Sequence, residues 1–206
     1  MSPSHPAQLG ALAGSMSRSV RGAASTFTQI VSERVGMSVS HVELVTHAHV
    51  ERCCDQLGDP QDDHPDARLC SVVQRMRTAD GAHAEATLVL PESGGLALVR
   101  RMLGLPHDIG ELTELEQDAL AEIGNIVIDA CTGVLSGAFG WHVEAAQPHV
   151  SLNARERRSG ARNRSGSALV THLSMHLSGQ RTKGLVVLEM DSAAMAPDAF
   201  AQRLHA

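Results

Sequence analysis

Residues 113–129 read TELEQDALAEIGNIVID, and this stretch decides the fold expected for the chain of 206 residues. Thr113 and Glu116 stand three residues apart just before an apolar run, which is the pattern of a capping box at a helix start. We therefore expect a helix from there to about Phe139. Its apolar positions share one broad face, as in a helix packed on a core: Leu112, Ala119, Ile123, Val127, Ala130 and Val134.

The opposite side of this helix carries a polar stripe. Asp118, Glu122, Asn125 and Asp129 fall within an arc of about 60°. Glu122 and Asn125 are three residues apart, so their side chains project together from adjacent turns. A carboxylate beside a carboxamide is able to engage one small target, although a polar stripe on an amphipathic helix is more often a solvated face.

A longer pattern surrounds this pair. Asp118, Glu122, Asn125 and Pro148 are separated by three, two and 22 residues. This spacing resembles the signature of the CheC, CheX and FliY phosphatases, in which Asp or Ser, Glu, Asn and Pro stand at the same intervals. The specific part of the resemblance is residues 112–150, and length and element order extend it over nearly the whole chain. It implies an α+β, pseudo-twofold domain with a central antiparallel sheet and two long helices exposed on one side.

The resemblance also implies an activity, hydrolysis of the aspartyl-phosphate of a CheY-like response regulator in chemotaxis. Asn125 would orient the attacking water, and Glu122 would pair with the regulator's lysine. Asp118 would support the helix or touch the partner's rim, and Pro148 would fix the entry of the following strand. In this family the regulator supplies the phosphoaspartate and the Mg²⁺, so we expect this chain itself to bind no metal or cofactor.

Two other interpretations stay open. The chain could be a non-catalytic adaptor of the same fold that binds a receiver domain, the deamidase CheD or the flagellar switch. It could also be an α+β domain in which the motif match is accidental. CheD is a possible partner of the enzyme as well, because the resemblance to CheC implies it.

The sequence suggests an internal duplication within a single domain spanning residues 1–206, with halves at about 10–104 and 111–206. At an offset of 108, residues 38–42 echo residues 146–150. The first half has lost the motif, because Gly14, Ser17 and Ser40 stand where the second half has Glu122, Asn125 and Pro148. We therefore expect one active face per chain.

The remaining elements follow from periodicity and turn signals. We expect a frayed start over residues 1–15, helices over 16–35, 93–103 and after Pro197, and strands over 36–46, 71–77, 85–90, 141–152, 167–177 and 185–190. The alternation in the first strand predicts that Met37, Val39, His41, Glu43 and Val45 share one side. In the strand over 167–177, His172 and His176 alternate, and we expect them to be exposed rather than ligating.

Composition excludes several classes of function. The net charge is −6 and aromatic residues make up 2% of the chain, which argues against nucleic-acid binding. We expect a cytoplasmic protein without membrane insertion and with reduced cysteines, because Cys53, Cys54, Cys70 and Cys131 form no CxxC pair. Two charged segments are read as solvated loops rather than metal or phosphate sites: Asp59, Asp62, Asp63, His64 and Asp66, and Arg155, Arg157, Arg158, Arg162 and Arg164.

Overall fold

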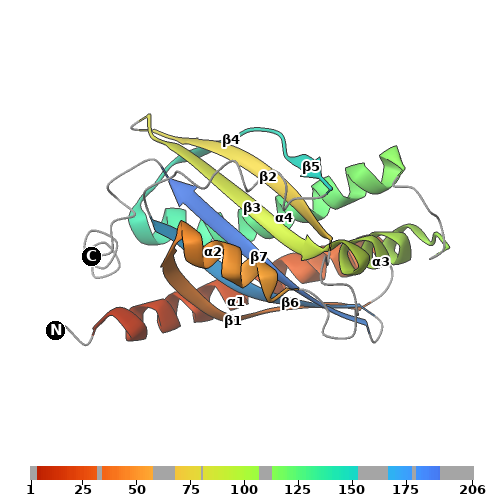
Figure 1. The fold of residues 1–206 in the computed structure, drawn as a ribbon, viewed down its shortest axis with the longest axis horizontal. Coiled ribbons are helices and arrows are strands. Elements are labelled where there is room, and N and C mark those ends of the chain that lie inside the picture. Colours follow the sequence, from red (N-terminus) through yellow and green to blue (C-terminus); the bar gives the residue numbers. More distant parts are fainter. Residues whose placement is uncertain are drawn as a thin grey trace.

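The computed structural model describes residues 4–31, 34–57, 68–79, 81–106, 113–152, 167–177 and 180–190. These residues form four helices and an antiparallel seven-stranded sheet (Figure 1). The helices are α1 (Ser4–Val31), α2 (His47–Asp55), α3 (Glu92–Leu103) and α4 (Glu114–Phe139). The strands are β1 (Val35–Thr46), β2 (Leu69–Thr78), β3 (His83–Pro91), β4 (Val143–Ala145), β5 (His149–Ser151), β6 (Ser167–Leu177) and β7 (Gln180–Met190).

The strand order is β1-β6-β7-β3-β2-β4, and β5 also pairs with β2. Every pairing is antiparallel. The order is symmetric about the β7–β3 pair, because β1 of the first half lies beside β6 of the second, while β4 and β5 of the second half lie beside β2 of the first. The expected α+β fold with a central antiparallel sheet is confirmed.

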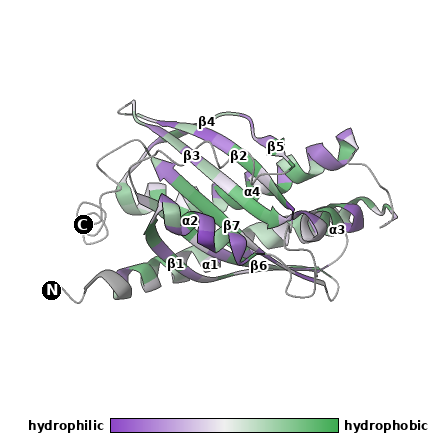
Figure 2. Cartoon of the chain, viewed as in Figure 1, coloured by the Kyte–Doolittle hydropathy of each residue, from purple (hydrophilic) through white to green (hydrophobic). Residues whose placement is uncertain are grey.

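The sheet has a hydrophobic core on each face. α1 and α4 pack against one face and against each other, with Met16, Phe27, Ile123 and Val127 buried there. α2 lies over the other face, where its apolar residues meet strand residues. Strands covered on both faces are apolar almost throughout. Figure 2 shows this in β3 and in the C-terminal half of β7, which are mostly hydrophobic, whereas α2 carries hydrophilic residues on its outer side.

Some sequence predictions were wrong. α1 begins at Ser4, within the segment expected to be frayed, and α2 was not predicted because nine residues give too little periodicity. The strand expected over residues 141–152 is interrupted between β4 and β5. The two charged loops and the helix expected after Pro197 lie outside the described residues.

The expected alternation of β1 was also wrong, because the strand contains a β-bulge. Its register against β6 shifts between Val39 and His41, which leaves Ser40 without a Cα partner. An extra residue in one strand reverses the faces of all that follows it. Met37 and Val42 therefore belong to the core beside α1, while Glu43 lies on the α2 face.

One face of α4 belongs to the hydrophobic core. It is the one helix within the described ranges that is long and apolar enough, by length and composition, to cross a membrane. Of its most apolar window, 44% is buried inside the protein.

Candidate functional site

The start of α4 is fixed by its cap and by a buried ion pair. The side chain of Thr113 accepts a hydrogen bond from the Glu116 backbone N–H, and the Thr113 backbone N–H donates one to the Glu116 carboxylate, so the predicted capping box is confirmed. Arg100 of α3 donates to the Glu116 carboxylate at 2.6 Å, and Glu116 is fully buried. Burial alone would raise the pKa of Glu116, but the hydrogen bonds from Thr113 and Arg100 outweigh it and lower this pKa.

Gly124 lets the middle of α4 approach the sheet closely. A Cβ atom at this position would lie 2.5 Å from the Cβ of Val72 on β2, which no side chain tolerates without movement. Gly133 and Gly137, by contrast, have no atom within 4 Å of such a position. Of the helix glycines, Gly124 is therefore the one that sets the distance between α4 and β2.

Most of the polar stripe of α4 lies at the surface. Asp118, Glu122 and Asp129 are exposed and Asn125 is half-buried. The Glu122 side chain makes no hydrogen bond or ion pair with any described residue. Burial and the neighbouring Glu122 carboxylate raise the pKa of Asp129. The predicted pair thus lies at the surface, with a carboxylate available to a partner's cation.

Asn125 is held from below by Gln74 of β2. The Gln74 side chain is 2% exposed, and its Nε2 donates to Asn125 Oδ1 at 2.9 Å and to the Ala146 carbonyl at 3.2 Å. Asn125 reaches this strand because the adjacent Gly124 brings the helix close. Sequence reasoning missed Gln74. The available signal was a polar residue among apolar neighbours in a predicted buried strand.

These contacts also fix which way the Asn125 amide points. The Ala146 carbonyl only accepts hydrogen bonds, so Gln74 must turn its Nε2 toward it. The Asn125 atom that faces the same Nε2 must then be the acceptor Oδ1. The Nδ2 group of Asn125, which donates to no described residue, is left for a ligand or water, together with the second lone pair of Oδ1.

Pro148 lies at the interruption between β4 and β5. β2 residues Val73 and Met76 pair with His149 and Ala145, so three residues on one strand face two on the other. Proline removes a backbone donor from the ladder at this point. The Gln74 side chain fills the interruption and binds the Ala146 carbonyl.

The corresponding surface of α1 is different. Gly14 and Ser17 stand in the positions of Glu122 and Asn125, and the Ser17 hydroxyl accepts from the Val39 backbone N–H at 3.4 Å. Small side chains leave a groove of about 690 Å³ between α1 and β1, lined in part by Gly10, Gly14, Ser17 and Arg21. The structure thus places a protruding polar pair on α4 and a hollow on α1.

Several solved structures have the same architecture as this chain. The crystal structure of Thermotoga maritima FliY aligns with 100% of this chain and 98% of its own, at a TM-score of 0.65 and 17% identity. A chain in the crystal structure of a FliG–FliM complex from H. pylori aligns with 91% of this chain and over 93% of its own length, at a TM-score of 0.61 and 13% identity. The chain has the CheC/CheX/FliY-like fold. A chain of a CheX–CheY–BeF₃–Mg²⁺ complex from Borrelia burgdorferi aligns with a lower TM-score of 0.49 and 14% identity, over 86% of this chain and 98% of the other.

The resemblance read from the sequence is therefore confirmed at the level of fold. No family model and no curated protein matches the sequence. Identities of 13–17% to the solved structures carry the fold alone. The roles of Asp118, Glu122, Asn125 and Pro148 rest on the motif and on the geometry of α4.

Proposed function

We propose that the chain is a protein phosphatase that removes the phosphoryl group from the aspartyl-phosphate of a CheY-like receiver domain. Water attacks phosphorus and the bond to the aspartyl oxygen breaks, which yields inorganic phosphate and the free carboxylate. Positioning and charge stabilisation dominate catalysis of such a transfer. The receiver contributes the phosphoaspartate, a lysine and Mg²⁺, and this chain contributes two side chains.

Asn125 orients the attacking water through its free Nδ2 group and the second lone pair of Oδ1. It takes up no proton, because a carboxamide is not basic at neutral pH. Glu122 pairs with the receiver's lysine and sets the register of the complex. The observation that carries the proposal is the hydrogen bond from the buried Gln74 side chain to Asn125. A solvated surface asparagine needs no buried partner that fixes the orientation of its amide.

A second candidate is a non-catalytic adaptor. The first half has lost the motif, and FliM, which shares the fold, has been solved in complexes with FliG and with SpeE. In this role the same α4 surface would bind a receiver domain or a flagellar partner without hydrolysis. The intact Glu122 and Asn125 favour the phosphatase.

The test is the dephosphorylation rate of a phosphorylated CheY-like receiver from the same genome, with Mg²⁺ present. The intact chain should accelerate phosphate loss, and Asn125→Ala should lower the rate about 100-fold or more while binding persists. Glu122→Ala should mainly weaken binding. Ser17→Ala, at the matching position of α1, is the control and should leave the rate unchanged.

Each other result has a defined meaning. Binding without acceleration by the intact chain would replace the phosphatase with the adaptor. Equal losses from Ser17→Ala and Asn125→Ala would remove α4 as the active face. If the intact chain neither binds any receiver domain of the genome nor accelerates its loss of phosphate, both functions are refuted and the assignment of the fold alone stands.

A further inference from the structure

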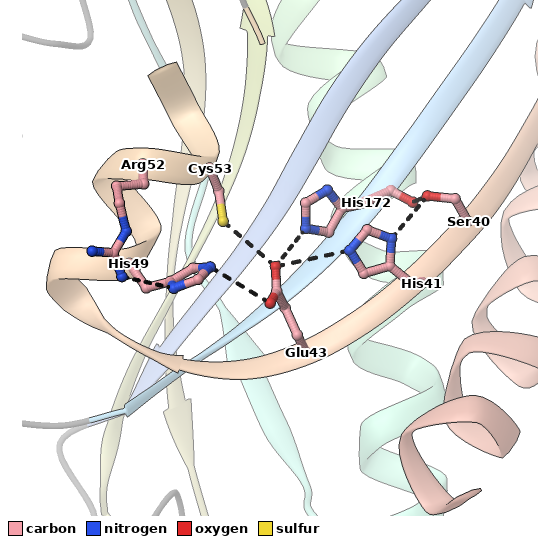
Figure 3. Close-up of polar contacts among 7 residues, drawn as sticks. All are labelled: Ser40, His41, Glu43, His49, Arg52, Cys53 and His172. Atoms are coloured by element: carbon pink, nitrogen blue, oxygen red, sulfur yellow. Dashed lines mark hydrogen bonds and ion pairs between the residues drawn. The ribbon is translucent and has the colours of Figure 1, made fainter. Parts of the chain in front are cut away.

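A second polar cluster lies on the sheet face that α2 covers, opposite the face that α1 and α4 cover. Glu43 of β1 is at its centre, with His41 of β1, His172 of β6, and His49 and Cys53 of α2 turned toward it (Figure 3). Three imidazoles around one carboxylate form a ligand set that suits transition-metal cations. This differs from the sequence-based expectation that His172 is exposed and that the chain binds no metal.

The β1 bulge brings these residues together. Because Ser40 is the extra residue, His41 lies directly opposite His172 in the β1–β6 register. Glu43 follows His41 by two residues, so both side chains leave the same face of the sheet. Without the extra residue His41 would point into the core beside α1. The bulge therefore has the effect of assembling three donor side chains from two neighbouring strands.

The donor atoms are already at near-ligating separations. Glu43 Oε1 lies 2.8 Å from His172 Nε2 and 3.9 Å from His41 Nε2, and the two rings stack with centroids 3.7 Å apart. The three donor atoms all lie within 4.8 Å of one another. In a tetrahedral zinc site with bonds of about 2.0–2.2 Å, the donor atoms lie about 3.3–3.6 Å from one another. The observed distances bracket this range. Because imidazole lone pairs lie in the ring plane, at least one of the two stacked rings must also turn out of the stack to direct its Nε2 at a shared cation.

Ser40 leaves the correct nitrogen of His41 available. Its hydroxyl donates to the His172 backbone carbonyl at 3.4 Å, so the same oxygen accepts from His41 Nδ1 at 3.3 Å. The proton of a neutral His41 is then on Nδ1, and Nε2 presents its lone pair toward Glu43. A second hydrogen-bonding partner that fixes the imidazole tautomer in this way is typical of metal-ligating histidines.

His49 and Cys53 contact the Glu43 carboxylate but are not oriented to ligate a cation. Arg52 donates to His49 Nδ1 at 2.9 Å, so a neutral His49 carries its proton on Nε2 and points it at Glu43 Oε2, 3.7 Å away. The Cys53 thiol donates to Glu43 Oε1 at 3.5 Å. Both groups orient the carboxylate rather than offer a lone pair.

We propose that His41 Nε2, His172 Nε2 and a Glu43 carboxylate oxygen form a binding site for one divalent transition-metal cation of the Zn²⁺ class. Three protein ligands leave a fourth position for water, and this position faces solvent because the His41 side chain is 57% exposed. On binding, neutral His172 takes the tautomer with its proton on Nδ1, so that Nε2 offers its lone pair to the cation and the imidazole stays neutral. The cation links β1 to β6, segments far apart in the chain.

The test is isothermal titration of the full chain, without a histidine tag and stripped with a chelator, with Zn²⁺ and with Co²⁺. We expect one equivalent per chain, Co²⁺ absorption bands of a four- or five-coordinate site, and no binding of Mg²⁺. His172→Ala and Glu43→Gln should each weaken Zn²⁺ binding by about 100-fold or more, and His49→Ala by about 10-fold. His176→Ala, on the same strand and outside the cluster, is the control and should bind as the intact chain does.

His41→Ala keeps the test decisive if a β6 variant fails to fold, since His41 is exposed and circular dichroism of the metal-free variant checks the fold. The site is refuted if Zn²⁺ binds without saturation at one equivalent. It is equally refuted if binding survives His41→Ala and Glu43→Gln, or if His176→Ala removes it. None of these results depends on phosphatase activity, which separates this proposal from the one above.

Discussion

α1 and α4 cover the same face of the sheet, but different contacts hold the two helices in place. α4 begins with a capping box and a buried ion pair, whereas the first turn of α1 contains no acidic residue. Gly124 lets α4 approach β2 closely. At an offset of 108, the corresponding residue of α1 is Met16, whose side chain is fully buried and contacts Thr171 of β6. The two helices therefore differ in how they are held as well as in their polar residues.

The strands beneath the helices differ in the same way. By the registers of β1 with β6 and of β5 with β2, the residue of β6 that takes the place of Gln74 is Leu173. Leu173 is buried in the core beside α1 and offers no hydrogen bond. The surface of α1, which carries no Glu–Asn pair, thus also lacks a buried side chain that would orient one. This indicates that the candidate site consists of a helix together with its underlying strand.

Among the contacts that distinguish α4 from α1, the buried ion pair of Glu116 should contribute most to stability. Glu116→Gln keeps the capping box, since glutamine also accepts from the Thr113 backbone, but it leaves the buried guanidinium of Arg100 without its carboxylate. The free energy of unfolding should therefore fall by about 3–5 kcal/mol. Urea denaturation measures it. Glu114→Gln, exposed in the same turn, should change it by less than about 0.5 kcal/mol. Similar losses from both variants would show that the ion pair has no special role.

The same pair gives the sign of the acid response. Because folding lowers the pKa of Glu116, its contribution to stability is complete above the pKa of the unfolded carboxyl and is lost as the pH falls through the folded pKa. The Glu116→Gln variant should therefore lose less stability than the intact chain between neutral and acidic pH. An equal loss in both would contradict this assignment.

Gly124→Ala should have the next largest effect, because it breaks the close approach of α4. The added methyl group overlaps Val72, and overpacking of this kind costs about 1–3 kcal/mol. Gly133→Ala, in open space on the same helix, is the matched control and should stabilise the chain by up to about 1 kcal/mol. If thermal or urea unfolding shows a gain for both variants, then α4 moves away from β2 without cost.

A smaller effect is expected from Gln74→Leu, which makes β2 resemble β6 at Leu173. Under the proposed function, kcat for receiver dephosphorylation should fall about 10-fold while KM stays constant, because Asn125 remains present but is no longer oriented. The free energy of unfolding should change by less than about 2 kcal/mol, because loss of the two Nε2 hydrogen bonds is offset by removal of the buried, unpartnered Oε1 from the core. Gln147→Leu, exposed beside the interruption, is the control. A rise in KM alone would assign Gln74 to partner binding.

Much of the fold could be predicted from the sequence, for physical reasons. Local signals are strong where periodicity is long, so the capping box and the end of α4 at Phe139 agree with the prediction, as does the strand over 167–177. The β1 bulge could not be predicted, because a single inserted residue depends on pairing with β6, more than a hundred residues away. That one residue determines the face on which His41 and Glu43 lie.

The candidate site was predicted in part. That Glu122 and Asn125 project together follows from helical spacing, which is local, whereas their choice as candidate site residues came from the motif they share with Asp118 and Pro148. The hold of Gln74 on Asn125 depends on Gly124 and on the interruption at Pro148 together, and each of these has an ordinary structural explanation when read alone. Contacts between elements far apart in sequence therefore had to come from the structure.

The smallest effect is expected from restoring the lost pair, and this variant sharpens the comparison most. Gly14→Glu with Ser17→Asn rebuilds the polar residues on α1 while Leu173 and Met16 stay beneath them. If orientation by the strand is required, a chain that carries this double change together with Asn125→Ala should remain as inactive as Asn125→Ala alone in the receiver assay. Adding Leu173→Gln supplies the missing donor, and any activity should return only then. Recovery with the double change alone would show that an exposed Glu–Asn pair is sufficient and that Gln74 is incidental.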